Sequence, residues 1–252
     1  MKPLLRWLGL LLLAMAALQL FFVLRIASMA LLAPESSAFQ RSEAWRLVRV
    51  QGRAPWRSQW VSYAQISDNL KRAVIASEDD GFNNHDGVDW DALEKAWQKN
   101  ARAEARSAKS QAGKGNGAAA SKKALTAPQP KVVGGSTITQ QLAKNLFLSG
   151  ERTLPRKGQE LVLTVLLEAL LSKQRILEIY LNSVEWGEGV FGAEAAAQRY
   201  FGKSAARLSA HEAARLAVML PRPKYFEKLP NSGYLAERAS VIAARLGGAE
   251  LP

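Results

Sequence analysis

The chain of 252 residues contains no cysteine and only two histidines, His85 and His211. The absence of cysteine excludes disulfide scaffolds, zinc sites with cysteine ligands and thiol nucleophiles. Two histidines cannot form a His-rich metal site, and a Ser-His-Asp triad would have to use one of them. There is also no Walker-type G-x-x-x-x-G-K-[ST] sequence, so a nucleotide-binding P-loop is not supported. Taken alone, each histidine is expected to be a structural hydrogen-bonding residue.

The composition is otherwise close to that of a globular protein. Hydrophobic residues make up 48% and charged residues 22% of the chain, which excludes extensive disorder, and the length predicts one or two domains. The formal net charge is +12, but eight basic residues against one acid lie within residues 99–131 and supply more than half of it. That segment has no aromatic side chain after Trp97 on which bases could stack, so we expect no nucleic-acid partner.

Residues 7–24 form an apolar run in which Gln19 is the only strongly polar side chain. As a helix the run would span about 27 Å, close to the thickness of a bilayer's hydrocarbon core. Lys2 and Arg6 precede it, which predicts a cytoplasmic N-terminus and places the rest of the chain outside that membrane. The alternative is a cleaved signal peptide, but its apolar region would be longer than usual. We therefore expect residues 1–33 to form an uncleaved, single-pass anchor.

The rest of the chain is predicted to be mainly helical, without alternation of strands and helices. Residues 34–66 are expected to form an irregular or short-strand lead-in, and residues 247–252 a tail. Apolar spacing, capping residues and prolines predict helices over 67–78, 89–106, 138–148, 156–182, 192–200, 209–220 and 234–246. The stretch 161–171 is expected to be a buried core helix. Residues 107–131, rich in Ala, Gly, Ser, Lys and Gln, are expected to form a flexible, solvated loop.

Three consecutive acids, Glu78, Asp79 and Asp80, stand at the end of the predicted helix 67–78. Acids at a helix C-terminus oppose the helix dipole, so their placement costs stability and favours a functional role. A carboxylate here could act as a general base if burial or a neighbouring like charge raised its pKa. The alternative is a solvated acidic turn.

The segment GGSTITQQLAKN (134–145) joins two glycines to a hydroxyl-capped helix N-terminus, which predicts an anion site. Gln140 and Lys144 are four residues apart and would share one face of that helix. Three further cations and one acid follow, at Arg152, Arg156, Lys157 and Glu160. Such a group suggests a multiply charged oxygen ligand such as pyrophosphate. The alternatives are an ordinary capped amphipathic helix and a surface ion pair between Arg156 and Glu160.

Five segments, in order along the chain, resemble the motifs of the peptidoglycan glycosyltransferases, glycosyltransferase family 51. They are EDDGFNNHDGVDW (78–90), GGSTITQQLAKNLF (134–147), RKGQE (156–160), KQRILEIYLN (173–182) and AAAQRYFGKSAARLSAHEAARLA (195–217). Together they are spread over residues 78–217. Bifunctional relatives add a transpeptidase domain with S-x-x-K and K-T-G motifs, which are absent from this sequence, so no transpeptidase activity is expected.

The resemblance implies a mainly helical, lysozyme-like fold over residues 67–246, with a head lobe and a smaller membrane-apposed lobe between the first two motifs. It implies polymerisation of lipid II into linear glycan strands of peptidoglycan, with inversion at the anomeric carbon and release of undecaprenyl pyrophosphate. The expected partners are lipid II, the growing glycan strand, membrane phospholipid and cell-wall synthesis proteins. The expected location is the cytoplasmic (inner) membrane, with the catalytic domain in the periplasm.

By motif position, the resemblance makes Glu78 the base that takes a proton from the acceptor's sugar 4-hydroxyl, and Glu160 a second essential acid. Lys144 and Arg152 would stabilise the departing pyrophosphate. Glu160 would orient these two cations or help to hold a divalent cation, Mg²⁺ or Mn²⁺, on the pyrophosphate; no tightly bound cofactor is expected. The remaining residues expected at the substrate site are Asp79, Phe82, His85, Ser136, Thr137, Gln140, Gln141, Arg156 and Lys157.

Two other functions fit parts of the sequence. A membrane-anchored muramidase or lytic transglycosylase shares lysozyme-like acids, but it binds no pyrophosphate and gives no reason for the cluster of cations. A non-catalytic envelope scaffold would bind glycan or lipid II without turnover, and the matched acids argue against it.

Overall fold

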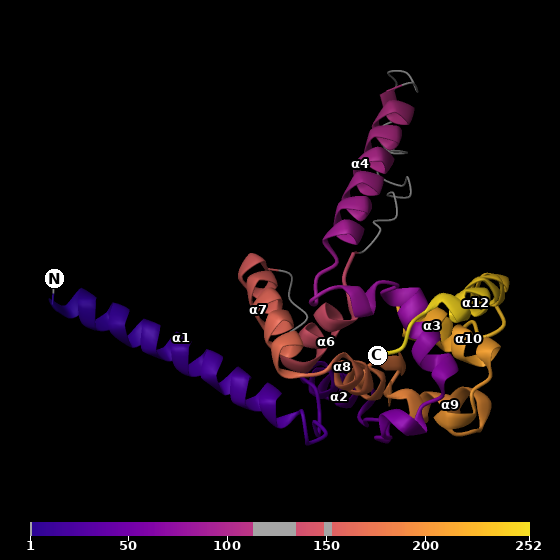
Figure 1. Cartoon of the computed structure of the whole chain (residues 1–252), viewed down its shortest axis with the longest axis horizontal. Coiled ribbons are helices and arrows are strands. Elements are labelled where there is room, and N and C mark those ends of the chain that lie inside the picture. The colour runs from indigo at the N-terminus through magenta and orange to yellow at the C-terminus, as the bar shows by residue number, and fades with distance from the viewer. Residues whose placement is uncertain (1, 113–134, 149–152) are drawn as a thin grey trace. The chain divides into compact units, whose positions relative to one another are not determined.

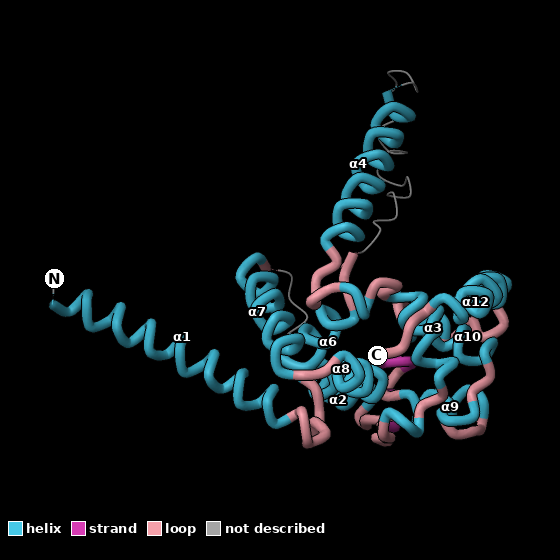
Figure 2. Tube along the Cα trace, viewed as in Figure 1, coloured by secondary structure: helices cyan, strands magenta, loops and turns pink. Residues whose placement is uncertain are grey.

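The structure is a computed structural model that describes residues 2–112, 135–148 and 153–252. It is mainly helical, as the sequence predicts, with three short strands among the described residues (Figures 1 and 2). The chain divides into two compact units, one of Met1–Val88 with Thr137–Pro252 and one of Asp89–Ser136. In sequence, the second unit falls largely between the first two of the five motifs.

The N-terminal apolar run forms one continuous helix, α1 (Lys2–Ser28). Its residues Pro3–Ser28 are apolar enough and long enough to cross a membrane. The end of α1 packs into the core of the first unit, where Ile26 is fully buried. Within the run, Gln19 Nε2 donates a hydrogen bond of 3.2 Å to Gln159 Oε1.

The prediction of an irregular or short-strand lead-in over residues 34–66 is wrong for its first half, where α2 (Ala38–Gln51) lies, whereas a short strand does form at residues 57–58. A capping box begins this helix: Ser37 Oγ accepts from the Gln40 amide at 3.0 Å, and Gln40 Oε1 accepts from the Ser37 amide at 2.8 Å. Gly52 ends it in the left-handed region, at a φ of 68°. The helix buries a single apolar side chain, so the sequence shows little of the apolar spacing that indicates a helix.

The single helix expected over 156–182 is in fact two helices, α7 (Leu154–Leu170) and α8 (Lys173–Ser183). Ser172 separates them, because its Oγ accepts from the Arg175 amide at 3.2 Å and so caps a new helix.

The apolar stretch 161–171 is buried on one face only. Leu163 and Leu167 are fully buried, whereas Val162 and Val165 keep 43% and 52% of their surface exposed. The expectation of a buried core helix is therefore confirmed for one face only, and α7 also presents exposed apolar side chains.

The other expected helices are confirmed. They are α3 (Asp68–Glu78), α6 (Ile138–Phe147), α9 (Ala193–Phe201), α10 (Ala210–Met219) and α12 (Gly233–Arg245). The hydroxyls of Ser67, Thr137 and Ser209 cap α3, α6 and α10, as predicted. Helix α10 packs against α3 and α12, and α6 packs against α7 and α8. The short helix α11 (Pro223–Phe226) was not predicted.

Three short strands join the segment after α2 to the turn after α8. They are β1 (Arg57–Ser58), β2 (Glu185–Gly187) and β3 (Val190–Phe191), in the order β1-β3-β2, with β1 parallel and β2 antiparallel to β3.

The expected tail at 247–252 is part of the folded unit. Ala249 is only 1% exposed, and its carbonyl accepts a hydrogen bond from Arg72 on α3. Asn83 Nδ2 donates to the Glu250 carbonyl at 3.0 Å. The C-terminal residues thus hold both α3 and the turn that follows it.

The second unit contains α4 (Trp90–Ala112), which Asp89 caps by accepting from the Ala92 amide at 2.8 Å. The helix continues six residues past its expected end at Arg106, so the first part of the expected loop 107–131 is helical. Residues 113–131 lie outside the described residues. Three apolar side chains of α4 are exposed: Trp90, Leu93 and Trp97 keep 67%, 44% and 74% of their surface.

Candidate active site

Glu78 is the last residue of α3, on a helix whose start Ser67 fixes and whose apolar face is buried from Leu70 to Ala76. Its Oε2 accepts a hydrogen bond of 2.9 Å from Gln141 Nε2 on α6. Burial raises the pKa of Glu78, and the neighbouring Asp79 charge adds to this, while the Gln141 hydrogen bond and the Lys144 charge act against it. A carboxylate with a raised pKa is a stronger base than an ordinary one. The site therefore has the group that the sequence predicts, in an environment suited to proton abstraction.

Gln141 is held in place from its other side. The Tyr180 hydroxyl on α8 lies 3.0 Å from Gln141 Oε1, and the Tyr180 side chain is fully buried. The sequence predicts Gln141 as a residue of the substrate site, but it gives no role to Tyr180. In the structure the Gln141 amide joins the end of α3 to α8, and its NH₂ group faces Glu78.

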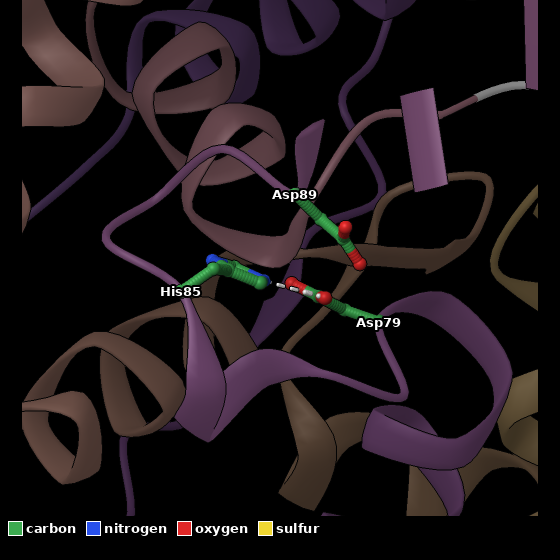
Figure 3. A group of neighbouring side chains, drawn as sticks. All are labelled: Asp79, His85 and Asp89. Carbon is green, nitrogen blue, oxygen red and sulfur yellow. Dashed lines mark hydrogen bonds and ion pairs between the residues drawn. The ribbon is translucent and has the colours of Figure 1, made fainter. Parts of the chain in front are cut away.

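Asp79 is a structural clasp between three segments, and Figure 3 shows its contact with His85. Its Oδ1 accepts from His85 Nε2 at 2.8 Å, and its Oδ2 accepts from the Ile138 amide at 2.9 Å. The Gly87 amide donates to His85 Nδ1 at 3.1 Å, so the His85 proton must lie on Nε2, which points to Asp79. Asp79 thereby fixes the turn after Glu78 to the start of α6.

This clasp changes the interpretation of the predicted anion site at the α6 N-terminus. The Ile138 amide donates to the chain's own Asp79 carboxylate, and the Gln140 amide donates to Thr137 Oγ1 at 3.2 Å. Gln140 Oε1 in turn accepts from the Thr137 amide at 3.2 Å, so its side chain folds back along the helix. Asp79 therefore supplies the negative charge that the helix dipole favours here, and Gln140 takes part in the capping box.

The alternative of a solvated acidic turn holds for one of the three acids. Asp80 is exposed and pairs with Arg245 at 2.9 Å. Asp79 is only 7% exposed, and Glu78 is bonded to Gln141. Two of the three carboxylates are thus built into the fold.

Phe82 and His85 support the loop that follows Glu78. Phe82 is fully buried, and its ring meets the His85 ring edge-on, with the centroids 6.5 Å apart. Lys173 Nζ lies 4.7 Å from the Phe82 ring centroid and donates to the His85 carbonyl at 2.6 Å. Sequence reasoning missed Lys173, although it opens the fourth motif.

The same lysine extends the network to α6. Lys173 Nζ pairs with Glu168 Oε1 at 2.9 Å, and Thr139 Oγ1 donates to that oxygen at 2.6 Å. Gly87 fits beside this network only because it has no side chain: its φ is +85°, and a Cβ would lie 2.6 Å from Thr164 Cγ2. The loop between Glu78 and α6 is therefore tightly specified.

Glu160 lies on α7 and is only 4% exposed. It accepts from Arg156 Nη1 at 3.0 Å and forms an ion pair with Lys157 Nζ. The pairing with Arg156 is predicted, but the burial of Glu160 excludes a simple surface pair. Arg152, the other cation expected to act with Lys144, lies outside the described residues.

Three further expected residues lie on α6 or directly before it in the sequence. Thr137 Oγ1 donates to the Gly87 carbonyl at 2.6 Å and so closes the loop before the helix. Lys144 is exposed, one turn after Gln141, and its charge acts to lower the pKa of Glu78. Ser136 is exposed and belongs to the second unit.

Much of this sequence is shared with known proteins. The sequence matches the family described as Transglycosylase over residues 46–113 and 114–247. It is 56% identical over 239 residues to a biosynthetic peptidoglycan transglycosylase of Burkholderia thailandensis, covering 95% of this chain and 84% of that protein. It is 50% identical over 253 aligned residues to a protein of the same name from Herminiimonas arsenicoxydans, covering 100% and 99% of the two chains. The five motifs that carry the resemblance all lie within the matched regions, and the chain belongs to the transglycosylase family.

Proposed function

We propose that this enzyme polymerises lipid II into linear glycan strands, with Glu78 as the general base. The relatives are named biosynthetic peptidoglycan transglycosylases, which favours strand synthesis over lytic cleavage. The observation that carries the proposal is Glu78 itself, a carboxylate whose pKa burial raises and whose orientation Gln141 fixes.

In the proposed reaction Glu78 takes the proton from the 4-hydroxyl of the acceptor sugar. The freed oxygen attacks the anomeric carbon of the lipid-linked donor strand, and undecaprenyl pyrophosphate leaves. A single displacement inverts the α linkage to β. The proton remains on the Glu78 carboxyl until solvent removes it, so the step balances without another reactant.

Lys144 and Arg152 would stabilise negative charge as it develops on the leaving pyrophosphate. A cation that acts mainly in the transition state raises kcat, because it is needed less in the ground state. Lys144 is exposed and close enough to Glu78 for its charge to affect the pKa of that carboxyl. The pair of cations that Glu160 holds, Arg156 and Lys157, would extend the positive region along α7.

Glu160 does not fit the role of a metal ligand. Its two oxygens pair with Arg156 and Lys157, whereas Mg²⁺ and Mn²⁺ need oxygen ligands that are free to coordinate. We propose instead that Glu160 positions these two cations. The proposed reaction uses no tightly bound cofactor, and no step depends on a divalent cation on the pyrophosphate.

The helix α1 fits a single-pass membrane anchor. We propose that its N-terminus is cytoplasmic, because Lys2 and Arg6 precede the apolar run. The rest of the chain would then lie in the periplasm, where lipid II is displayed on the outer face of the inner membrane. The exposed Trp90 and Trp97 on α4 fit a membrane interface.

The experiment that tests the proposal uses the purified full chain in detergent with labelled lipid II. Formation of glycan polymer is expected. Cleavage of preformed glycan would support a lytic enzyme, and binding without turnover would support a scaffold; either result would refute the proposal.

A further inference from the structure

A chain of two hydrogen bonds links the buried core to Glu78. The Tyr180 hydroxyl lies 3.0 Å from Gln141 Oε1, and Gln141 Nε2 lies 2.9 Å from Glu78 Oε2. The three side chains come from α8, α6 and α3, and Tyr180 is fully buried. Neither the motif analysis nor the proposed reaction gives Tyr180 a role.

The donor and acceptor capacities of these groups allow two arrangements. An ionised carboxylate only accepts, so Gln141 must turn its NH₂ group to Glu78 and its carbonyl to Tyr180, whose hydroxyl then donates. A protonated Glu78 has an O–H to donate. The Gln141 amide can then reverse, so that its carbonyl accepts from Glu78 and its NH₂ group donates to the Tyr180 oxygen. A tyrosine hydroxyl serves both arrangements because it can donate or accept.

We propose that Tyr180 is a positioning residue that acts on Glu78 through the Gln141 amide. With the hydroxyl donating, the amide is held in the orientation that favours the ionised base before proton transfer. After transfer, the hydroxyl can accept, and the amide can reverse to accommodate the protonated carboxyl. This inference rests on the proposed function, in which Glu78 is the base.

The neighbouring charges do not replace the effect of the Gln141 amide on Glu78. Among the described residues, Asp79 follows it on the chain and Lys144 faces it from α6, and their charges act on its pKa in opposite directions. Burial and the charges of Glu78 and Asp79 raise the pKa of Tyr180 well above its usual value. The phenol therefore keeps its proton in the working pH range and acts only through hydrogen bonding.

The test is the pH dependence of kcat/KM for lipid II polymerisation by the full chain in detergent, since its acidic limb reports the ionisation of the free enzyme's base. Tyr180→Phe leaves the Gln141 carbonyl without its donor, so the amide loses its preferred orientation and the hydrogen bond to ionised Glu78 weakens. One net hydrogen bond corresponds to a shift of about half to one pH unit. We expect the acidic limb to move to higher pH by about this amount, with KM little changed.

Two further variants keep the result interpretable. Gln141→Met removes the donor to Glu78 and should move the acidic limb in the same direction, and adding Tyr180→Phe to it should cause no further shift. The matched control is Tyr200→Phe, because Tyr200 donates to the Trp186 carbonyl at 2.7 Å and not to the Gln141 amide. Its acidic limb should stay at the wild-type pH.

An unshifted limb in Tyr180→Phe, an equal shift in Tyr200→Phe, or additive shifts in the double variant would overturn the inference. If Tyr180→Phe does not fold, the position of the limb in Gln141→Met decides, since no shift there means that the amide does not control Glu78. Failure of the proposed function is seen separately, as turnover that survives Glu78→Gln.

Discussion

Replacing Asp79 by asparagine should remove the clasp that joins the turn after Glu78 to α6. The carboxylate offers an acceptor to the His85 ring and another to the Ile138 amide, whereas asparagine offers one acceptor and one NH₂ donor. One of the two buried donors is left facing another donor. His85 cannot resolve the clash by moving its proton to Nδ1, because the Gly87 amide already donates to that atom.

A buried donor left without a partner costs about 1–3 kcal/mol. In a chain of this size, 1 kcal/mol corresponds to roughly 2–4 °C of Tm, so Asp79→Asn should melt about 2–12 °C below the wild type. Thermal unfolding of the full chain in detergent, followed by circular dichroism, measures this. The control is Asp80→Asn, because Asp80 is exposed and its pair with Arg245 contributes at most about 1 kcal/mol. This reasoning would be refuted if Asp79→Asn had the Tm of the wild type, or if Asp80→Asn lowered the Tm as much as Asp79→Asn does.

Two other predictions concern single charges. Lys144→Ala should lower kcat by about 10²–10³-fold while raising KM much less, if the charge acts on the leaving group; steady-state kinetics in which only KM changes would contradict this. Burial raises the pKa of Glu185 to about 7, with Lys224 opposing and Glu43 adding to the effect. The folded protein then holds a proton that the unfolded chain releases near the ordinary value of 4.5, so this group makes stability fall as pH rises from 4.5 to 7. Glu185→Gln should flatten that fall in Tm measured across this range, and an unchanged pH dependence would count against the raised pKa.

Local signals in the sequence were sufficient for several elements of the fold. Ser67, Thr137 and Ser209 each cap the helix that the sequence places after them, because an N-cap needs only residues within one turn. The acidic turn at Glu78 was found for a similar reason, since three adjacent acids oppose a helix dipole wherever the helix packs.

Other elements depended on packing that no short segment reveals. Helix α2 has a complete capping box at Ser37, but Leu47 is the single apolar side chain it buries, so its helical period was too weak to detect. The break at Ser172 was hidden because apolar residues continue on both sides of it. In each case the helix begins where a serine hydroxyl, that of Ser37 or Ser172, accepts a hydrogen bond from a backbone amide.

The contacts that build the active site are long-range and were the least predictable. Gln141 and Lys144 were identified by motif, yet the bonds of Gln141 to Glu78 and Tyr180 join three helices that are distant in sequence. The anion expected at the α6 N-terminus is Asp79, which lies 59 residues earlier in the chain. Residue types can indicate such chemistry, but only the folded chain shows which donor meets which acceptor.

The central claim is that Glu78 is the base for glycan polymerisation, and Glu78→Gln tests it most directly. The substitution keeps the volume of the side chain and removes the carboxylate that accepts the proton. With labelled lipid II and the full chain in detergent, polymer formation should fall by about 10²–10⁴-fold, while lipid II binding and Tm stay close to those of the wild type. Turnover near the wild-type rate in a folded Glu78→Gln variant would contradict the account.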